Sequence, residues 1–263
     1  MKNGLFEHQH RTDIILLTTF PILVAFATSY FELNYIIATF LFFGLPSIYL
    51  SLKNPARFKR SLIFSLILLG IFSLIIDYPA YVDKSWFVPN SAFRFLDNST
   101  PIEDIIWAFL WVFFAITFWE YFLDKSGNHR HFSRNLRYLI VLGALMLSAF
   151  FSAYFLKPEI LNIPYFYLKF GLILFAVPIA LVLLRFHKLI PKVFSIGLYF
   201  FFISFLTEVV GLQNKHWLFD GPHFIATFNF FGHLIPLEEI VFWWGLGVPG
   251  IICWYEFFGD DHK

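Results

Sequence analysis

Two short motifs place paired carboxylic acids at the start of apolar segments. Residues 101–104 read Pro-Ile-Glu-Asp, and residues 236–239 read Pro-Leu-Glu-Glu. Two carboxyl groups that leave water together do not both ionise easily, so one of them keeps its proton near neutral pH. A helix N-terminus acts in the opposite direction, and the sequence does not decide which effect is larger. Each motif could supply a general acid beside a carboxylate, and the candidate catalytic residues are Glu103, Asp104, Glu238 and Glu239.

Helix capping is the simpler interpretation of these motifs. Proline is favoured at the first position of a helix, and carboxylates in the first turn complement the helix dipole. The run from Thr100 to Glu103 also fits a capping box. The second copy weakens this interpretation, because Ile235 stands where a Ser or Thr cap would be. Acids near membrane depth are costly and usually face a cavity or a partner, which favours a functional role.

Aromatic residues follow both motifs at helical spacing. Trp107 and Phe242 lie four residues after the first acid of their motif, and Trp243 lies four residues after Glu239. On a helix these rings lie on the same face as the acids, one turn deeper. A buried acid backed by aromatic faces suits carbocation chemistry, because a proton starts the reaction and the π faces stabilise the cation. Ordinary packing or an interfacial aromatic belt is the alternative for any single ring.

A second pair of acids precedes the motifs at a repeated spacing. The first half reads Asp-x6-Lys-x-Trp from Asp77, and the second half reads Glu-x6-Lys-x-Trp from Glu208. These two acids either support the site or end their helices at the interface. The lysines could be their counter-ions or interfacial anchors. The tryptophans join the aromatic set, so the candidate substrate-binding residues are Trp86, Trp107, Trp217, Phe242 and Trp243.

The repeated spacing predicts a duplicated chain. Asp77 and Glu208 are 131 residues apart, and Pro101 and Pro236 are 135 residues apart. We therefore predict two domains, residues 1–130 and residues 131–263, with four helices and one motif each. Four helices per half would orient both halves the same way, related by an axis along the membrane normal. Both motifs then lie on one side of the membrane and could meet between the halves.

The composition predicts that these residues lie in a membrane protein. Apolar residues make up 59% of the 263 residues and charged residues 14%, and 39 residues are Phe. Soluble domains have about 45–50% apolar and about 25% charged residues. The predicted fold class is therefore an all-α polytopic membrane helical bundle. About eight stretches approach the roughly 20 residues that a spanning helix needs, the third being the shortest. They are Ile14–Phe31, Tyr35–Leu52, Ser61–Ile76, Ile105–Leu123, Tyr138–Leu156, Leu168–Phe186, Val193–Leu212 and Leu237–Phe258.

The distribution of positive charge predicts the orientation. With eight helices, one side holds both termini and the loops at 53–60, 124–137 and 185–192, and it carries 14 of the 19 Lys and Arg residues. Cytoplasmic loops are enriched in these residues, so we place both termini in the cytoplasm of a cell-membrane or inner-membrane protein. Glu120 and Glu256 end their helices on this side, and we expect them to face water.

Several function classes are excluded or disfavoured by the sequence. A net charge of +1 argues against a nucleic-acid binder, which would show a basic stripe. The single cysteine, Cys253, excludes disulfide scaffolds and cysteine metal clusters, and we expect no metal site. Residues 245–250 spell Gly-x-Gly-x-x-Gly, but no strand precedes them and a proline interrupts them. We interpret this run as a helix kink or close-packing site and expect no cofactor.

The paired motifs, each preceded by a Trp-bearing loop and followed by an aromatic helix, resemble those of the integral-membrane lycopene cyclases. These are the non-flavin carotenoid cyclases that occur as heterodimers or fused tandem domains. The resemblance is specific over about residues 77–122 and 208–257. Members are usually built from units of about three helices, so a chain of eight helices departs from the family pattern.

The resemblance implies a redox-neutral isomerase that closes the linear ends of lycopene into β-ionone rings. Protonation of the terminal double bond makes a tertiary cation, the neighbouring alkene closes the ring, and loss of a proton ends the reaction. In the family the motif acids are the presumed acid and base, which corresponds here to Glu103, Asp104, Glu238 and Glu239. The implied partners are the lipid bilayer and a long lycopene-like polyene. The sequence does not decide between β- and ε-rings or between one and both ends. It also leaves open a homo-oligomer or an assembly with other carotenoid enzymes.

Three other functions fit parts of the pattern. A proton-coupled transporter also has parallel repeats with intramembrane acids, but the predicted helices contain few polar residues to line an aqueous route. A cyclase that acts on another terpenoid would need the same acids and aromatic rings. A non-catalytic scaffold in a carotenoid assembly would tolerate replacement of all four motif acids.

Overall fold

The computed structural model describes residues 2–124 and 132–260, with side chains described from His10 onward. In these residues eight helices are long and apolar enough to cross a membrane, so the predicted all-α polytopic bundle is confirmed. Two short hairpins accompany the helices. The membrane-crossing helices are His10–Phe31, Tyr35–Lys53, Pro55–Asp83, Ile102–Leu123, Leu136–Leu156, Phe166–Arg185, His187–Gln213 and Glu239–Gly259.

Several of these helices are built from consecutive segments, and those labelled η are π-helical or 3-10 turns. The first half contains α1 (Lys2–Phe31), α2 (Tyr35–Thr39), η1 (Phe40–Gly44), α3 (Leu45–Lys53), α4 (Pro55–Asp83), β1 (Arg94–Phe95), β2 (Thr100–Pro101), α5 (Ile102–Phe118) and η2 (Trp119–Leu123). The second half contains α6 (Leu136–Leu156), η3 (Pro158–Leu161), α7 (Phe166–Gly171), η4 (Leu172–Ala176), α8 (Val177–Arg185), η5 (His187–Leu189), α9 (Ile190–Gln213), β3 (Thr227–Phe230), β4 (His233–Pro236), η6 (Glu239–Gly247), α10 (Val248–Trp254) and η7 (Tyr255–Gly259).

The third helix is longer than the sequence predicts. The apolar run covers only Ser61–Ile76, whereas α4 has 29 residues and includes charged side chains near both ends. At one end Arg57 and Arg60 are buried. Both form ion pairs with Glu120 of η2. Pairing offsets the cost of burying their charges, so the helix continues past the point where the hydropathy pattern stops.

The expectation that Glu120 and Glu256 face water is wrong. Both side chains are buried. Glu120 also accepts a hydrogen bond from Tyr255, and Glu256 accepts one from the Trp119 indole at 2.6 Å. Arg60 contacts Asp260 at 2.9 Å in addition to Glu120, so this cluster joins the last helices of the two halves.

Three membrane-crossing helices contain a π-helical segment that ends two residues before a proline. Proline has no N–H, and its ring clashes with the carbonyl of the residue four positions earlier. A wider turn relieves this conflict; in η1, for example, the Leu45 N–H donates to the carbonyl of Phe40. The three pairs of segment and proline are η1 with Pro46, η4 with Pro178, and η6 with Pro249.

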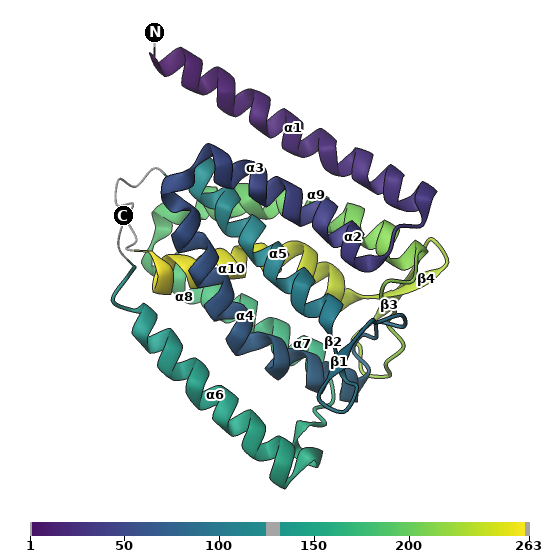
Figure 1. Ribbon diagram of the computed structural model, residues 1–263. Coiled ribbons are helices and arrows are strands. Elements are labelled where there is room, and N and C mark those ends of the chain that lie inside the picture. The colour runs from purple at the N-terminus through teal and green to yellow at the C-terminus, as the bar shows by residue number, and fades with distance from the viewer. Residues whose placement is uncertain (1, 125–131, 261–263) are drawn as a thin grey trace.

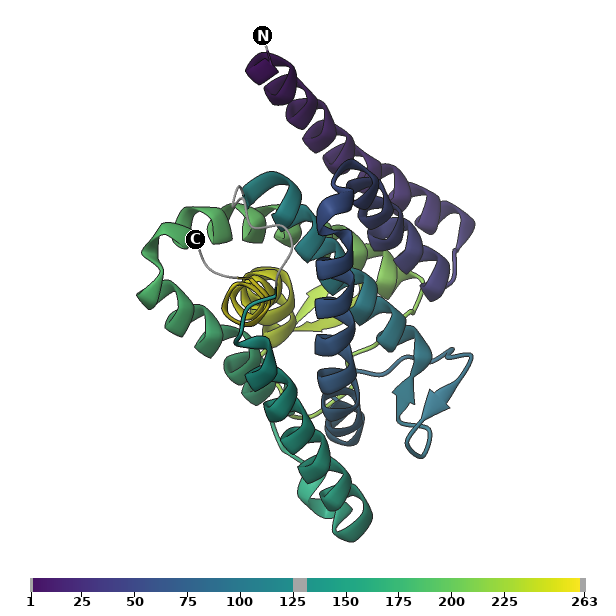
Figure 2. The same ribbon diagram turned by 60° about the vertical axis from the view of Figure 1, so that its left-hand side comes forward.

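The last helix, η6 to η7, lies at the centre of the bundle and is seen end-on in Figure 2. In its apolar window 61% of residues are buried, against 17% in α6 and 28% in α1. These two poorly buried helices diverge from the bundle in Figure 1. The central helix also explains the glycine run at 245–250, because a Cβ at Gly247 would lie 2.9 Å from the Trp111 ring, and one at Gly250 would lie 2.8 Å from Phe175. The run is therefore a close-packing site.

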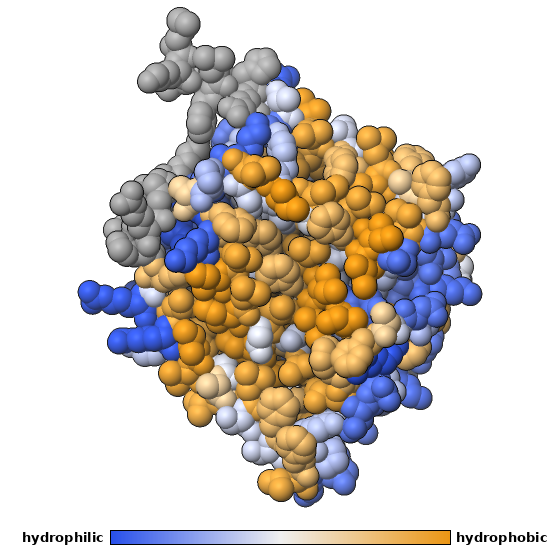
Figure 3. Space-filling model, viewed as in Figure 1, coloured by the Kyte–Doolittle hydropathy of each residue, from blue (hydrophilic) through white to orange (hydrophobic). Residues whose placement is uncertain are grey.

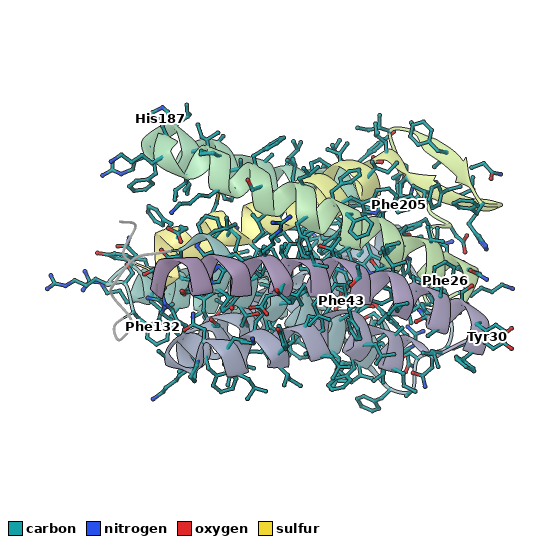
Figure 4. The ribbon with its side chains drawn as sticks, turned by 90° about the horizontal axis from the view of Figure 1, so that it is seen from above. Phe26, Tyr30, Phe43, Phe132, His187 and Phe205 are labelled. Atoms are coloured by element: carbon teal, nitrogen blue, oxygen red, sulfur yellow. The ribbon has the colours of Figure 1, made fainter. Side chains whose placement is uncertain are left out.

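The two ends of the bundle differ in character. In Figure 1 both hairpins lie at the right end, whereas the start of α1 and the end of η7 lie toward the left. Figure 3 shows a broad apolar band with hydrophilic residues gathered at either edge. Viewed from above in Figure 4, His187 and Phe132 lie toward the end opposite the hairpins, and Tyr30 and Phe205 lie nearer to them. This arrangement is that of a multi-pass membrane protein.

Candidate functional site

The two motif loops meet at one end of the bundle. Phe87, in the loop after α4, forms an antiparallel bridge with Leu218, in the loop after α9. The two backbone hydrogen bonds of this bridge measure 2.9 and 2.8 Å. The loops of the two halves are thus joined directly, and both motifs lie at this end, as the spacing of the repeats predicts.

Each motif proline closes a hairpin and leads into a helix. Pro101 pairs with Arg94 across β1–β2, and Pro236 pairs with Thr227 across β3–β4. In the first half the helix starts at the next residue, with Pro101 in an extended conformation and without a side-chain cap. The capping box suggested by Thr100 and Glu103 is therefore not formed.

The first acid of each motif anchors its own loop. Glu103 accepts hydrogen bonds from the Ser91 hydroxyl at 2.5 Å and from the Ala92 N–H at 2.7 Å. Glu238 accepts one from the Ile225 N–H at 2.7 Å. These bonds hold the carboxyl groups against loop backbone in both halves.

The second acid of each motif faces a cavity of about 130 Å³ between the two halves. Four carboxylic acids line it, together with aromatic and aliphatic side chains from both halves. Neither Glu103 nor Glu238 is among its lining residues. The acids, the tyrosine and the tryptophans that line it are Tyr35, Asp77, Trp86, Asp104, Trp107, Trp111, Glu208, Trp217, Glu239 and Trp243.

The acids that lie together in the cavity are therefore not neighbours in the sequence. Asp104 lies near Asp77, six residues before the end of α4, and Glu239 lies near Glu208 on α9. An α-helix turns about 100° per residue, so consecutive side chains do not face the same cavity. The same rule predicts from the sequence that the side chains of Glu103 and Asp104 point in different directions.

In the first half, two donors hold Asp104. The Tyr35 hydroxyl donates to it at 3.0 Å and the Trp86 indole N–H at 3.3 Å. Arg94 adds a favourable electrostatic interaction. Sequence reasoning missed Tyr35 because it lies 69 residues before Asp104, and nothing in a single sequence connects the two positions.

In the second half, an aromatic donor holds each acid. Glu239 accepts a hydrogen bond from Tyr167, and Glu208 accepts one from the Trp217 indole at 2.8 Å. The carboxyl groups of Glu208 and Glu239 lie close enough to repel each other when both are ionised.

The aromatic rings of the two halves interlock around the acids. The Tyr35 ring lies 5.2 Å from the Trp217 ring, and the Tyr167 ring lies 5.4 Å from the Trp86 ring. Each tyrosine therefore donates to an acid of its own half and packs against a tryptophan of the other. This exchange explains why the cavity requires both halves.

Three tryptophans form one wall of the cavity. The Trp243 ring lies 5.2 Å from both Trp107 and Trp111, and these two stack at 5.3 Å. Trp111 was not among the predicted residues, although it follows Trp107 by four positions. Phe242 lies elsewhere: it is buried, and it packs so closely against Gly171 that a Cβ there would lie 2.2 Å from its ring.

Several polar residues of the loops lie outside the cavity. Lys84 and Lys215 are exposed and adopt left-handed backbone conformations after α4 and α9, and among the described contacts neither pairs with Asp77 or Glu208. His216 is buried, and burial lowers the pKa of its imidazole below the usual range. Its Nε2 lies 2.8 Å from the carbonyl oxygen of Leu33.

One acidic group at the opposite end has a spacing that could hold a metal ion. It consists of Glu120, Asp124 and Asp260, and Arg57 and Arg60 form ion pairs with these same carboxylates. The two guanidinium groups therefore already pair with all three carboxylates.

Comparisons with protein families, with curated proteins and with solved structures find no match for this chain.

Proposed function

We propose that this protein is a membrane-embedded lycopene cyclase that forms β-ionone rings by proton-initiated, redox-neutral cyclisation. The observation that carries the proposal is the cavity between the halves, where buried carboxylic acids face a wall of tryptophans. Protonation of an alkene needs an acid shielded from water, and the resulting cation needs electron-rich neighbours that do not trap it. Indole faces meet the second requirement, because they stabilise positive charge without forming a bond to it.

The size of the cavity fits one end of a polyene. At about 130 Å³ it is close to the engineered cavity of about 150 Å³ that binds benzene. One six-membered ring would fill such a space, and the remainder of a long substrate would extend along the apolar walls. Leu68, Phe72 and Phe175 contribute to those walls.

The reaction places different demands on the motif acids. Asp104 and Glu239 line the cavity and can exchange protons with a substrate end bound there. Glu103 and Glu238 instead hold the loops that close the site. We therefore assign the proton chemistry to acids that line the cavity, which include the second acid of each motif, and a positioning role to the first acid.

The orientation of the protein belongs to the same proposal. The side that carries 14 of the 19 Lys and Arg residues would face the cytoplasm, with both termini. The hairpins and the acid motifs would then lie on the opposite side of a cell or inner membrane.

Expression in a lycopene-accumulating host tests the activity. We expect the host to turn from red to orange and to contain ring-ended carotenoids of the same mass as lycopene, because the reaction is an isomerisation. Chromatography with mass spectrometry identifies these products. Unchanged lycopene in cells whose membranes contain the folded protein would refute the proposal. Products of lower mass would indicate an oxidative reaction and would refute it equally.

A further inference from the structure

Asp77 differs from the other three acids of the cavity. Its side chain is 8% exposed, yet no hydrogen bond or ion pair to it occurs within residues 10–124 and 132–260. It lines the main cavity on the side of α4. The other three acids each accept a hydrogen bond from a tyrosine or a tryptophan.

A carboxylic acid in this position keeps its proton. Ionisation would leave a buried negative charge without a cation or a donor to compensate it. Asp104, which lies nearby in space, further disfavours ionisation of Asp77 through like-charge repulsion. Asp104 is also buried, but Tyr35 and Trp86 donate to it and Arg94 attracts it, which favours its ionised form. Of the two acids that face this cavity, Asp77 is therefore the one that holds a proton more readily.

A second, smaller cavity adjoins this pair on the loop side. Its volume is about 10 Å³, close to the minimum that accommodates one water molecule. Asp77 and Asp104 line it together with Arg94, and the exposed residues Tyr81 and Phe87 form its outer wall. One guanidinium nitrogen of Arg94, Nη1, is buried without a hydrogen-bond partner in the described part of the chain. This pocket therefore lies between Asp77 and exposed residues at the loop end of α4.

Glu208, the counterpart of Asp77 in the second half, is held by a donor. It accepts a hydrogen bond from the Trp217 N–H. At the position that matches Arg94 in the other hairpin, Thr227 pairs with the motif proline. The acids of the two halves therefore have different surroundings.

We propose that Asp77 is the acid that protonates the substrate, and that it exchanges its proton with water through the small cavity beside Arg94. The proposal rests on the proposed cyclase function and names its proton donor. The Asp77 O–H bond breaks and a C–H bond forms at the terminal alkene, leaving a tertiary cation. The neighbouring alkene supplies the electron pair that closes the ring. Asp104 then takes a proton from the ring carbon beside the new cation. Asp104 releases this proton to water in the small cavity that both acids line, and Asp77 takes up a proton from the same water, which restores both groups.

Replacement of Asp77 separates this role from that of Glu208. Membranes that contain the full chain are supplied with lycopene, and ring formation is measured per amount of folded protein. We expect Asp77→Asn to lower the rate by about 100-fold or more, the usual contribution of a general acid. Asp77→Glu should retain measurable cyclisation, because it keeps a carboxylic acid in the cavity. Glu208→Gln should lose less activity than Asp77→Asn.

A matched control and an isotope measurement complete the test. Asp97→Asn makes the same chemical change at an exposed loop residue that accepts a hydrogen bond from Tyr154, and we expect wild-type rates from it.

In D2O the wild-type protein should place one deuterium in each new ring. If Asp77→Asn does not fold, Asp77→Ser provides the same comparison. A folded variant without the acid that keeps more than about a tenth of the wild-type rate would overturn the role of Asp77. Rings without deuterium would overturn the exchange route. In either case an active wild type leaves the cyclase function standing, whereas an inactive wild type removes both proposals.

Discussion

The chemistry of the site depends on the direction in which each side chain points from its helix. Glu103 and Asp104 are adjacent in sequence, but one binds the loop at Ala92 and the other faces the cavity with Asp77. The difference follows from the 100° rotation per residue of an α-helix. We therefore propose separate functions for these two neighbouring acids, one in positioning a loop and one in proton transfer.

This division predicts opposite results for two similar substitutions. Asp104→Asn should lower cyclisation by about 100-fold or more, because an amide cannot exchange a proton in the cavity. Glu103→Gln should keep most of the activity per folded protein. It should instead lower the free energy of unfolding by about 1–3 kcal/mol, since one loop donor loses its charged acceptor. Product formation in membranes and thermal unfolding in detergent measure the two effects. A catalytically inactive but stable Glu103→Gln protein would contradict the assignment.

At the scale of elements, wide helical turns and close contacts set the position of the site. Tyr35 begins the helix that continues through η1, and Tyr167 lies in α7, one segment before η4. Each π-helical segment has about one residue more per turn than an α-helix. Side chains before the segment therefore point in a different direction, relative to those after its proline, than they would in a regular α-helix. Both tyrosines thereby reach acids on neighbouring helices.

The close packing of α9 against a tryptophan of the following loop predicts how two glycine substitutions differ. A Cβ at Gly211 would lie 2.3 Å from the Trp217 ring, whereas one at Gly70 in α4 would meet nothing within 4 Å. Gly211→Ala should lower the free energy of unfolding by about 1–3 kcal/mol through overpacking. It should also slow cyclisation, because the displaced indole no longer donates well to Glu208. Gly70→Ala is the control and should be neutral or slightly stabilising, since alanine is the better helix former. Equal unfolding midpoints for the two variants would argue against the packing described here.

At the scale of the whole molecule, two similar halves enclose one cavity and are joined at both ends. Phe87 and Leu218 link the loops at the hairpin end. Arg60 links Glu120 of the first half to Asp260 of the second at the other end. The cavity lies between these two connections, and both its acids and its tryptophan wall come from both halves. Neither half alone would complete it.

The proposed orientation can be tested with single cysteines. Cys253 is buried, and Cys253→Ala provides a background without thiols. Asn98→Cys in the first hairpin loop and Lys188→Cys at the opposite end are both exposed positions. In bacterial spheroplasts, a membrane-impermeant maleimide should label Asn98→Cys and leave Lys188→Cys unlabelled until the membrane is opened. The reverse pattern would show that the termini are not cytoplasmic.

The membrane bundle, the approximate positions of its eight helices and the repeated motifs could be predicted from the sequence. Length and hydropathy suffice for the helices, because a bilayer requires a similar length of every apolar helix that crosses it. The spacing of the repeats also placed both motifs at one end. These properties are read along the chain and do not depend on how distant residues pack.

The acids that lie together, and the residues that surround them, could not be predicted without the tertiary structure. The pairing of Asp104 with Asp77, the donation from Tyr35 and the burial of Glu120 all depend on the rotation of one helix against another. That rotation is set by packing between residues distant in sequence, such as Gly247 against Trp111. A single sequence does not record these contacts, so it identified the motif acids without distinguishing the acid that faces the cavity from the acid that holds the loop.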